Sequence, residues 1–436
     1  MTSSRHSAAS HRGLSISVAA QAWAALAALA AFPILARGLG VVDRGRFALV
    51  LAISEIGTLL FKMGLPEAAS FCDKEHLGNQ RSILREVRRS AYWLMPLSIA
   101  AGLATYALIL DDYPTAVRII GSLAVAQSPL LDTLSLSRVR LMISRGDERG
   151  IALNTGLPNT FLLVALIIFN AAGHITLFNT VLCAYAANIA GYLVAYWRIR
   201  PSRDPVEEVP ELTKFAVRNA PYSMMEAVNL RLDQVALPII AGPAQLGIYA
   251  VATSLTAPIS RVGLAASASF YSTVQLTSSD RGRSDAGAAF RRSAVLVIGV
   301  SILAMLFAPL AIYLLAGDAY RGAIVLTIVL AVAWCLFAMA VVAANLLGAL
   351  GNPGAASGSQ AVGLVVTLLL LIPAIELFGA RGAAIASLLS YLVRLAYCVR
   401  ALRNRDVLNL KPHRADVMWV IGPFRSAFFK LVRRET

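Results

Sequence analysis

Residues 215–261, FAVRNAPYSMMEAVNLRLDQVALPIIAGPAQLGIYAVATSLTAPISR, decide the fold of this chain. They predict two membrane-spanning helices joined by a very short turn at Gly242-Pro243. The first helix is apolar, yet four charged residues interrupt it: Arg218, Glu226, Arg231 and Asp233. A charged side chain near the bilayer centre costs at least about 2.5 kcal/mol. Such residues usually face a bundle interior or a water-filled cavity, so the stretch indicates a polytopic protein with a polar interior.

Polar residues gather on one face of this first helix. They follow one another at spacings of 4, 4, 3 and 4 residues, which places them on one side of a regular helix: Arg218, Tyr222, Glu226, Asn229 and Asp233. Arg231 is only two residues from Asp233 and points roughly the other way. We therefore expect a lumen on one side of the helix and an ion pair with a neighbouring helix on the other.

The composition of the whole chain agrees with a membrane protein. Of the 436 residues, 58% are hydrophobic and 14% are charged. Soluble domains are only about half apolar and about a quarter charged. The apolar runs have the length of membrane helices and are too long for barrel strands. The four cysteines and five histidines show no metal-ligand or redox spacing, so we expect no metal site.

The apolar runs predict twelve spans, which lie at about 14–36, 45–69, 90–110, 115–136, 150–171, 175–197, 216–240, 244–270, 293–316, 322–347, 358–377 and 380–400. Their connections alternate between very short ones and mostly longer, basic ones. Four or five Lys and Arg residues stand in each of the long connections 70–89, 137–149, 198–215 and 271–292. Because basic connections stay in the cytoplasm, both termini are predicted to be cytoplasmic. The net charge of +15 is then mainly a topology signal, and we expect contact with membrane lipids and no nucleic-acid partner.

Two short motifs repeat between the halves of the chain. Asp111-x-Tyr113 recurs as Asp318-x-Tyr320, and Gly45-x-Phe47-Ala48 recurs as Gly247-x-Tyr249-Ala250. The fold class predicted from this repeat is an all-α polytopic membrane protein built of two parallel six-helix repeats. The domains would be an N-terminal bundle over 1–200, a linker over 201–215, a C-terminal bundle over 216–400 and a basic cytoplasmic tail over 401–436. Transporters of this build hold the substrate path at the repeat interface and rock one half against the other.

The stretch quoted first also resembles a known family. The pattern R-x-D-Q, L-P, G-P and G-x-Y-A-V-A is similar to the start of the second half of oligosaccharide-lipid flippases. The matching residues are Arg231, Asp233, Gln234, Leu237, Pro238, Gly242, Pro243, Gly247, Tyr249, Ala250, Val251 and Ala252. These flippases form the polysaccharide-biosynthesis branch of the multidrug/oligosaccharidyl-lipid/polysaccharide exporter (MOP) superfamily, which also holds multidrug exporters of the MATE type. The runs LLAGDAYRGA (314–323) and FGARGAAIASLLSYL (378–392) extend the resemblance. It implies a bacterial inner-membrane flippase, with an undecaprenyl-pyrophosphate-linked oligosaccharide as its substrate and other polysaccharide-assembly proteins as partners.

Four cations are candidates for binding an anionic head group. Arg and Lys suit phosphate, the first by forked hydrogen bonds and the second as a point charge. The set consists of Lys62, Arg218, Arg231 and Arg261. Two alternatives stay open, since Lys62 is near enough to a helix end to reach the interface and Arg231 faces either the lumen or a helix interface. Asp132, Arg218 and Arg394 stand near cytoplasmic helix ends and are interpreted as boundary residues, while Gln360 either lines the lumen or bonds between helices.

Three carboxylates are candidates for coupling transport to a proton or sodium ion: Glu55, Glu226 and Asp233. The alternative is a static ion pair in which Glu55 or Asp233 binds Arg231. Tyr222 and Asn229 are expected to line the lumen. No nucleotide-binding motif of the G-x-x-x-x-G-K-S/T kind is present in the sequence, so energy would come from an ion gradient, the membrane potential or consumption of product.

Three functions are compatible with these patterns. The first is a flippase and the second a multidrug exporter of the same fold, for which a less cationic and more aromatic lumen is expected. The third is a membrane glycosyltransferase or polymerase, which needs catalytic residues in a sizeable outer loop. Every predicted outer connection is at most about eight residues long, so the chain is predicted not to be an enzyme and to have no catalytic residues.

Overall fold

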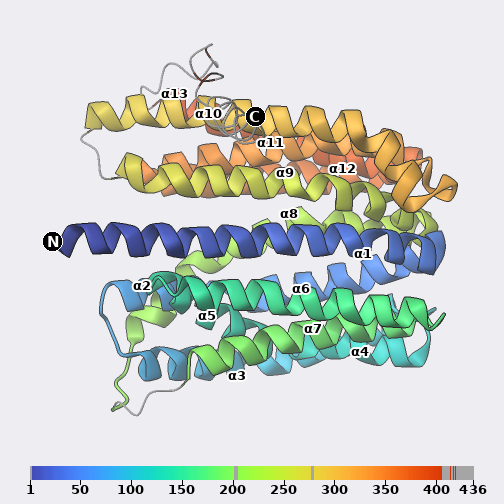
Figure 1. Cartoon of the computed structure of the whole chain (residues 1–436), viewed down its shortest axis with the longest axis horizontal. Coiled ribbons are helices and arrows are strands. Elements are labelled where there is room, and N and C mark those ends of the chain that lie inside the picture. The colour runs from blue at the N-terminus through green and yellow to red at the C-terminus, as the bar shows by residue number, and fades with distance from the viewer. Residues whose placement is uncertain are drawn as a thin grey trace, which may run out of the picture. The chain divides into compact units, whose positions relative to one another are not determined.

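The computed structural model describes residues 2–200, 205–275 and 279–404, together with His413, Asp416 and Met418; side chains are described from residue 19, without 227, 264–284 and 353. These residues form helices and no strand (Figure 1). The α-helices are α1 (Thr2–Phe61), α2 (Leu65–Lys74), α3 (Gln80–Ala104), α4 (Thr115–Ala126), α5 (Leu131–Ser144), α6 (Glu148–Ala171), α7 (Leu177–Arg198), α8 (Pro210–Ala241), α9 (Pro243–Gln275), α10 (Ser279–Ala311), α11 (Ala323–Ala349), α12 (Pro353–Phe378) and α13 (Ala380–Arg403).

The predicted spans and the observed helices agree over most of the chain. The largest differences lie in the first half, where the span predicted for 115–136 is two helices, α4 and α5, bent by 50°. The span predicted for 45–69 ends at Phe61, and Gly64, with a φ of 73°, begins the separate helix α2. A positive φ favours glycine, which has no Cβ to clash with the backbone.

Eight helices in the described part of the chain are long and apolar enough to cross a membrane, or nine if the bent pair α4 and α5 is one span. The protein is therefore a multi-pass, all-α membrane protein, as the sequence predicted. The number twelve stays a prediction. α1 counts once although it is kinked at Gly40, and α8 falls outside the eight because charged residues interrupt it.

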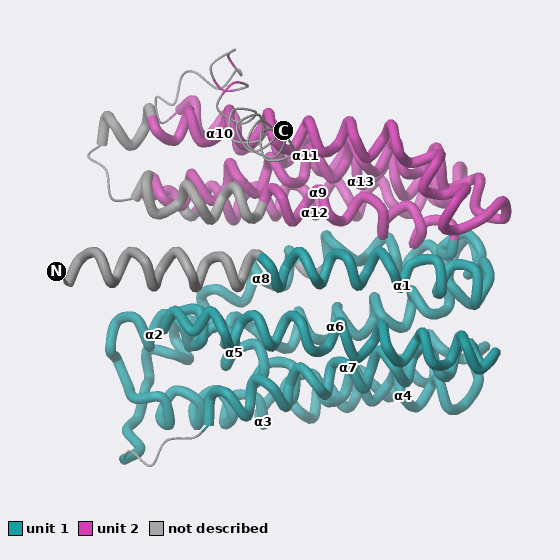
Figure 2. The backbone as a smooth tube through the Cα atoms, viewed as in Figure 1, with its two compact units in different colours: residues 1–247 teal, residues 248–436 magenta. Residues whose placement is uncertain are grey.

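The chain divides into two compact units, residues 1–247 and residues 248–436 (Figure 2). In unit 1, α1 packs against α6, α8 and α4, α6 packs against α7, and α2 packs against α5 and α8. The apolar core at the α2 end of this unit includes Ala68, Cys72, Ile83, Leu141 and Leu212. α8 is thus part of unit 1. The predicted bundle boundaries at 200 and 216 differ from the unit boundary at 247, because α8 packs against α1 and α2 in unit 1.

Unit 2 is built on α11, which packs against α13, α10 and α12, while α12 and α13 lie against each other along their length. α11 is the most buried of these helices, and its small residues, among them Ala338, Ala343 and Ala344, allow close packing. Most of the predicted tail 401–436 and residues 201–204 of the predicted linker lie outside the described residues.

The internal repeat is visible in the backbone of both halves. Gly40 and Gly242 have similar extended conformations with positive φ, at φ 70°, ψ 178° and φ 85°, ψ 160°. Each stands five residues before a glycine of the repeated motif, Gly45 or Gly247. Likewise, α3 and α10 each continue into a one-turn π-helix, Thr105–Ile109 and Ile312–Ala316. Each π-helix comes shortly before a repeated Asp-x-Tyr motif, so the two halves share local geometry as well as residues.

Candidate functional site: the polar face of α8 and the charges around it

The polar residues predicted to share one face lie on a single helix, α8, which continues through Pro221 and Pro238. Their burial increases along the helix. Arg218 is exposed, Tyr222 and Glu226 are partly buried, and Asn229 and Asp233 are 6% and 8% exposed. One oxygen of the Asp233 carboxylate accepts a hydrogen bond from the backbone N–H of Gln234 at 2.8 Å. α8 therefore carries a polar stripe from an exposed first half into the interior of unit 1.

Arg231 pairs with a neighbouring helix, as its position opposite this stripe predicted. Its guanidinium forms an ion pair with the carboxylate of Glu55 on α1. Both side chains keep substantial exposure, 31% for Arg231 and 50% for Glu55. Of the alternatives left open by the sequence, the structure contains the ion pair between Glu55 and Arg231.

Lys62 is not a free cation at a helix end. It is 9% exposed, and its Nζ lies 3.6 Å from Oε1 of Glu67, the acidic residue in the first turn of α2. The same Oε1 accepts a hydrogen bond from Nη2 of Arg140 on α5 at 3.3 Å. One carboxylate therefore lies between two cations, and this cluster of Lys62, Glu67 and Arg140 keeps a net positive charge.

Arg261, the remaining predicted cation, lies on α9 in unit 2 and is exposed. Asp132, interpreted from the sequence as a boundary residue, accepts a hydrogen bond from the Thr58 hydroxyl at 2.9 Å. That interpretation is wrong for Arg394, which is only 1% exposed. Arg394 lies on the side of α13 that packs in unit 2, and its guanidinium carbon is 5.3 Å from the Phe337 ring centre on α11.

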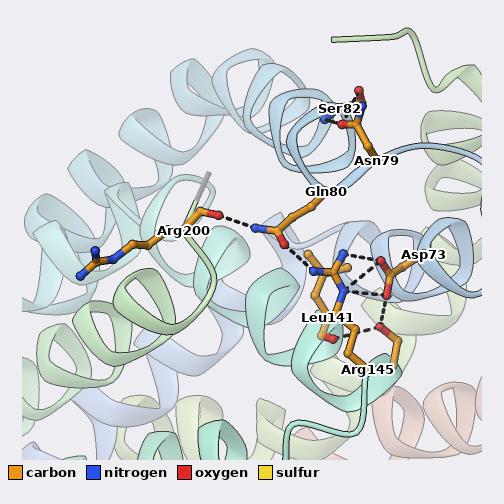
Figure 3. A network of polar contacts seen from close by, with 8 residues as sticks. Asp73, Asn79, Gln80, Ser82, Leu141, Arg145 and Arg200 are labelled. Carbon is orange, nitrogen blue, oxygen red and sulfur yellow. Dashed lines mark hydrogen bonds and ion pairs between the residues drawn. The ribbon is translucent and has the colours of Figure 1, made fainter. Parts of the chain in front are cut away.

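A polar network joins four segments of unit 1 at the α2 end (Figure 3). Nη2 of Arg145 lies 2.6 Å from the Asp73 carboxylate, which also accepts a hydrogen bond from the Ser144 hydroxyl at 2.5 Å. Arg145 also donates to the side chain of Gln80, which donates in turn to the carbonyl of Arg200. Burial alone would raise the pKa of Asp73, but the hydrogen bonds and charge of Arg145 outweigh it, so the pKa is lowered. The network ties α2 and α5 to the start of α3 and the end of α7.

A second charged contact lies at the same end of unit 1. Asp147 binds Arg198 through two hydrogen bonds of 2.6 Å, one to each carboxylate oxygen. These bonds lower the pKa of Asp147. Such bidentate pairs are stronger than single contacts because both oxygens are held. The basic residues of this end therefore fix helix positions as well as providing positive charge.

Several residues of these charged sets were not singled out from the sequence as site residues, and Glu67 and Arg394 show why. Glu67 follows Leu65-Pro66 at the start of a short helix. Lys62 and Glu67 are not three or four residues apart and Gly64 breaks the helix between them, so the sequence predicts no ion pair between the two. Arg394 is close to a helix end in sequence, and only the packing of α11 on α13 shows its burial. Among the described residues no group of three His, Cys, Asp or Glu side chains is arranged to hold a metal ion.

Comparison with known proteins agrees with this fold. Residues 153–325 match the family described as polysaccharide biosynthesis protein. No sequence among the curated proteins matches the chain. Among solved structures, the inward closed lipid II flippase MurJ has a TM-score of 0.69 at 9% identity, over 94% of this chain and 92% of that chain.

Two further structures are similar in fold. An inward-facing multidrug resistance transporter of the MATE family has a TM-score of 0.64 at 14% identity, over 87% of this chain and 96% of that chain. A MOP superfamily transporter from Pyrococcus furiosus has a TM-score of 0.57 at 15% identity, over 91% of this chain and 94% of that chain. The protein therefore has the fold of MOP superfamily transporters. The match of residues 153–325 to a polysaccharide biosynthesis family agrees with the resemblance noted in the sequence.

Proposed function

We propose that this protein is a flippase of the bacterial inner membrane that moves a lipid-linked oligosaccharide from the cytoplasmic to the outer leaflet. The substrate would be an undecaprenyl-pyrophosphate-linked oligosaccharide used in surface polysaccharide synthesis. The observation that carries this proposal is the polar face of α8, which leads from exposed Arg218 to buried Asn229 and Asp233. The polysaccharide-biosynthesis match over residues 153–325 supports the class of substrate.

Two cations of unit 1 suit a pyrophosphate. Arg231 and Lys62 each have a carboxylate partner, Glu55 and Glu67 respectively. An entering diphosphate would compete with these carboxylates for the cations, so each acid would hold its cation until the substrate displaces it. Arg261 of α9, which is exposed, is the cation of unit 2 proposed for head-group binding.

The carboxylates supply a route for coupling. Asp233 and Glu226 lie on the polar face of α8, and each could take up a proton or sodium ion when the substrate leaves. Uptake by Glu55 would release Arg231 and make it available to the substrate. The two halves would then rock, and the lipid tail would stay in the bilayer while the head group crosses.

Deletion of the gene tests the function directly. Lipid-linked oligosaccharide should accumulate on the cytoplasmic side, and the wild-type gene should restore its export. Lys62→Ala and Arg231→Ala should each lower export about tenfold or more, because each removes a charged contact to phosphate. Arg85→Ala, at an exposed position of α3 outside these clusters, is the control and should export normally. Export that is unaffected by deletion would overturn the proposal.

Coupling is tested in vesicles that contain the purified protein. Flipping should be faster with an ion gradient than without one, and Asp233→Asn and Glu226→Gln should remove that difference. If flipping needs no gradient and both variants behave as wild type, coupling by these residues is excluded while the flippase function remains.

The second candidate is a multidrug exporter, which the likeness to a multidrug MATE transporter favours. Cells that overproduce the protein would then tolerate cationic drugs better than cells with an empty vector, and Lys62→Ala would not reduce this tolerance. Unchanged drug tolerance together with accumulation of lipid-linked sugar in the deletion strain separates the two functions.

A further inference from the structure

Unit 2 contains a buried polar pair that has no role in the proposed transport path. Arg394 of α13 is 1% exposed, and Gln360 of α12 is fully buried. All three guanidinium nitrogens of Arg394 lack a hydrogen-bond partner among the described residues, and so do both amide atoms of Gln360. Buried polar groups are nearly always hydrogen-bonded, so two such side chains in one unit require an explanation.

The two side chains lie at the same level of the α12–α13 pair. The Ser390 hydroxyl donates to the carbonyl of Gly363 at 2.8 Å, and Gly358 lies against the side chain of Tyr397. These two contacts show that the helices are antiparallel. Arg394 lies on α13 between Ser390 and Tyr397, whose partners on α12 are Gly363 and Gly358 respectively. The residues of α12 between 358 and 363 thus lie at the level of Arg394. Gln360 is therefore opposite Arg394.

An aromatic cluster covers part of the Arg394 guanidinium. The guanidinium carbon lies 5.3 Å from the centre of the Phe337 ring. The centre of that ring lies 5.1 Å from the ring centre of Tyr391 and 5.2 Å from that of Trp334. The face of an aromatic ring attracts a cation. The five N–H donors of a guanidinium, however, lie in its own plane. The ring therefore offsets part of the charge and leaves the donors without acceptors.

Among the described residues, no carboxylate of unit 2 neutralises Arg394. Asp318 binds Arg321 at 2.9 Å and Asp416 binds Arg291 at 2.9 Å. Asp285 and Glu376, the other two described carboxylates of unit 2, form no hydrogen bond with Arg394, whose three guanidinium nitrogens have no partner in the described part of the chain. Arginine stays protonated in proteins, so the charge cannot be removed by loss of a proton. A lone buried charge is strongly unfavourable unless it is paired. The positive charge of Arg394 therefore has no negative partner among the described residues, and an anion would supply one.

We propose that unit 2 binds one small inorganic anion, of the size of chloride, between Arg394 and Gln360. The Arg394 guanidinium would donate its in-plane N–H groups to the anion, and the Gln360 amide would donate a further N–H. Because Arg394 is only 1% exposed, a small ion fits this position better than a bulky lipid head group does. The site lies on α12 and α13 and does not depend on the proposed flippase function.

Equilibrium binding of radioactive chloride to the full-length protein in detergent tests the site. We expect saturable binding of one chloride per chain, displaced by bromide and not by gluconate, which is too large. Chloride should also raise the thermal unfolding midpoint at constant ionic strength, with gluconate as the replacement anion. Absence of saturable binding to the wild-type protein would overturn the proposal.

Variants locate the bound anion. Arg394→Gln should weaken binding about tenfold or more, since it removes the charge-assisted hydrogen bonds, and Gln360→Leu should weaken it less. Arg400→Gln, at an exposed position of α13, is the matched control and should bind chloride as wild type does. Binding that is the same in Arg394→Gln as in wild type overturns the site. If Arg394→Gln does not fold, the anomalous signal of bromide in wild-type crystals decides, because a peak away from Arg394 contradicts the proposal.

Discussion

Gly45 of α1 and Gly247 of α9 face each other so closely that neither position has room for a side chain. A Cβ at Gly45 would overlap the carbonyl oxygen of Pro243, and a Cβ at Gly247 would overlap the carbonyl oxygen of Val41. The two glycines occupy equivalent positions of the internal repeat, five residues after Gly40 and Gly242. The glycines of the repeated motif thus allow the backbones of the two copies of the repeat to touch each other.

Replacing either glycine with alanine should therefore destabilise the protein. Gly45→Ala or Gly247→Ala forces backbone to move, and overpacking of this kind costs about 1–3 kcal/mol. We expect a lower thermal unfolding midpoint and less folded protein in the membrane. Gly156→Ala is the control, because nothing lies within 4 Å of a Cβ at that position of α6. It should be neutral or slightly stabilising, since alanine favours helix more than glycine does. Equal effects at positions 45 and 156 would contradict the close contact.

The pair of Glu55 and Arg231 should show its interaction in a charge exchange. Arg231→Glu places two carboxylates together and Glu55→Arg places two guanidinium groups together, so each single variant should be less stable than wild type. The double variant restores opposite charges and should recover most of the loss. Residues in contact show coupling energies of about 0.5–3 kcal/mol. Thermal unfolding of the four proteins measures the coupling, and additive effects of the two changes would mean that the ion pair is absent in the membrane.

The cluster of Lys62, Glu67 and Arg140 depends on its one acid. Glu67→Gln leaves the buried ammonium of Lys62 and the guanidinium of Arg140 without a carboxylate. Leaving a buried charged group without its partner costs on the order of 1–3 kcal/mol or more, so the unfolding midpoint should fall. The double variant Lys62→Met/Glu67→Gln removes the buried charge and should recover part of the loss. Glu75→Gln, at an exposed position just after α2, is the control. A double variant less stable than Glu67→Gln would show that Lys62 has another partner.

Much of this architecture was predictable from the sequence, because membrane helices consist of long runs of apolar residues. The ends of α6, α7, α11 and α13 lie within a few residues of the predicted spans. The break between α4 and α5 was missed although the sequence carries a signal for it, because residues 127–130 read Gln-Ser-Pro-Leu between two apolar stretches. A proline disfavours the helical conformation of the residue before it, so this segment should have been given more weight than the apolar residues on either side.

The candidate site was predictable only in part. The stripe on α8 and the opposed Arg231 follow from helical spacing alone, and both are present in the structure. The partner of Lys62 lies across the turn at Gly64, and the burial of Arg394 depends on α11, which is about fifty residues away in sequence. Contacts between separate helices are not encoded in the periodicity of either helix.

Acid should weaken the network around Asp73. The pKa of this carboxyl is lower in the folded protein than in the unfolded chain, where it is about 3.9. The ionised form therefore contributes stability above that pH, and the contribution is lost as the pH falls through the folded pKa. We expect the unfolding midpoint to be level above about pH 5 and to fall below about pH 4. Asp73→Asn should reduce this fall without abolishing it. The pKa of Asp147 is also lowered, by its hydrogen bonds to Arg198, so protonation of Asp147 would still destabilise the protein in acid. A pH profile of Asp73→Asn identical to that of wild type would contradict the role of the network.

The predicted orientation has a direct test in cysteine labelling. The natural cysteines Cys72, Cys183 and Cys398 are buried and Cys335 is partly buried, and all four are free thiols that can be replaced by alanine. Single cysteines are then introduced at four exposed positions: Glu75, His174, Asp318 and Asn404. Because basic connections stay in the cytoplasm, a membrane-impermeant maleimide added to whole cells should label positions 174 and 318 and should not label 75 and 404. Labelling of 75 and 404 after the membrane is opened is the control that these thiols are reactive. The opposite pattern in intact cells would place both termini outside, and it would reverse the direction in which the proposed flippase carries its substrate.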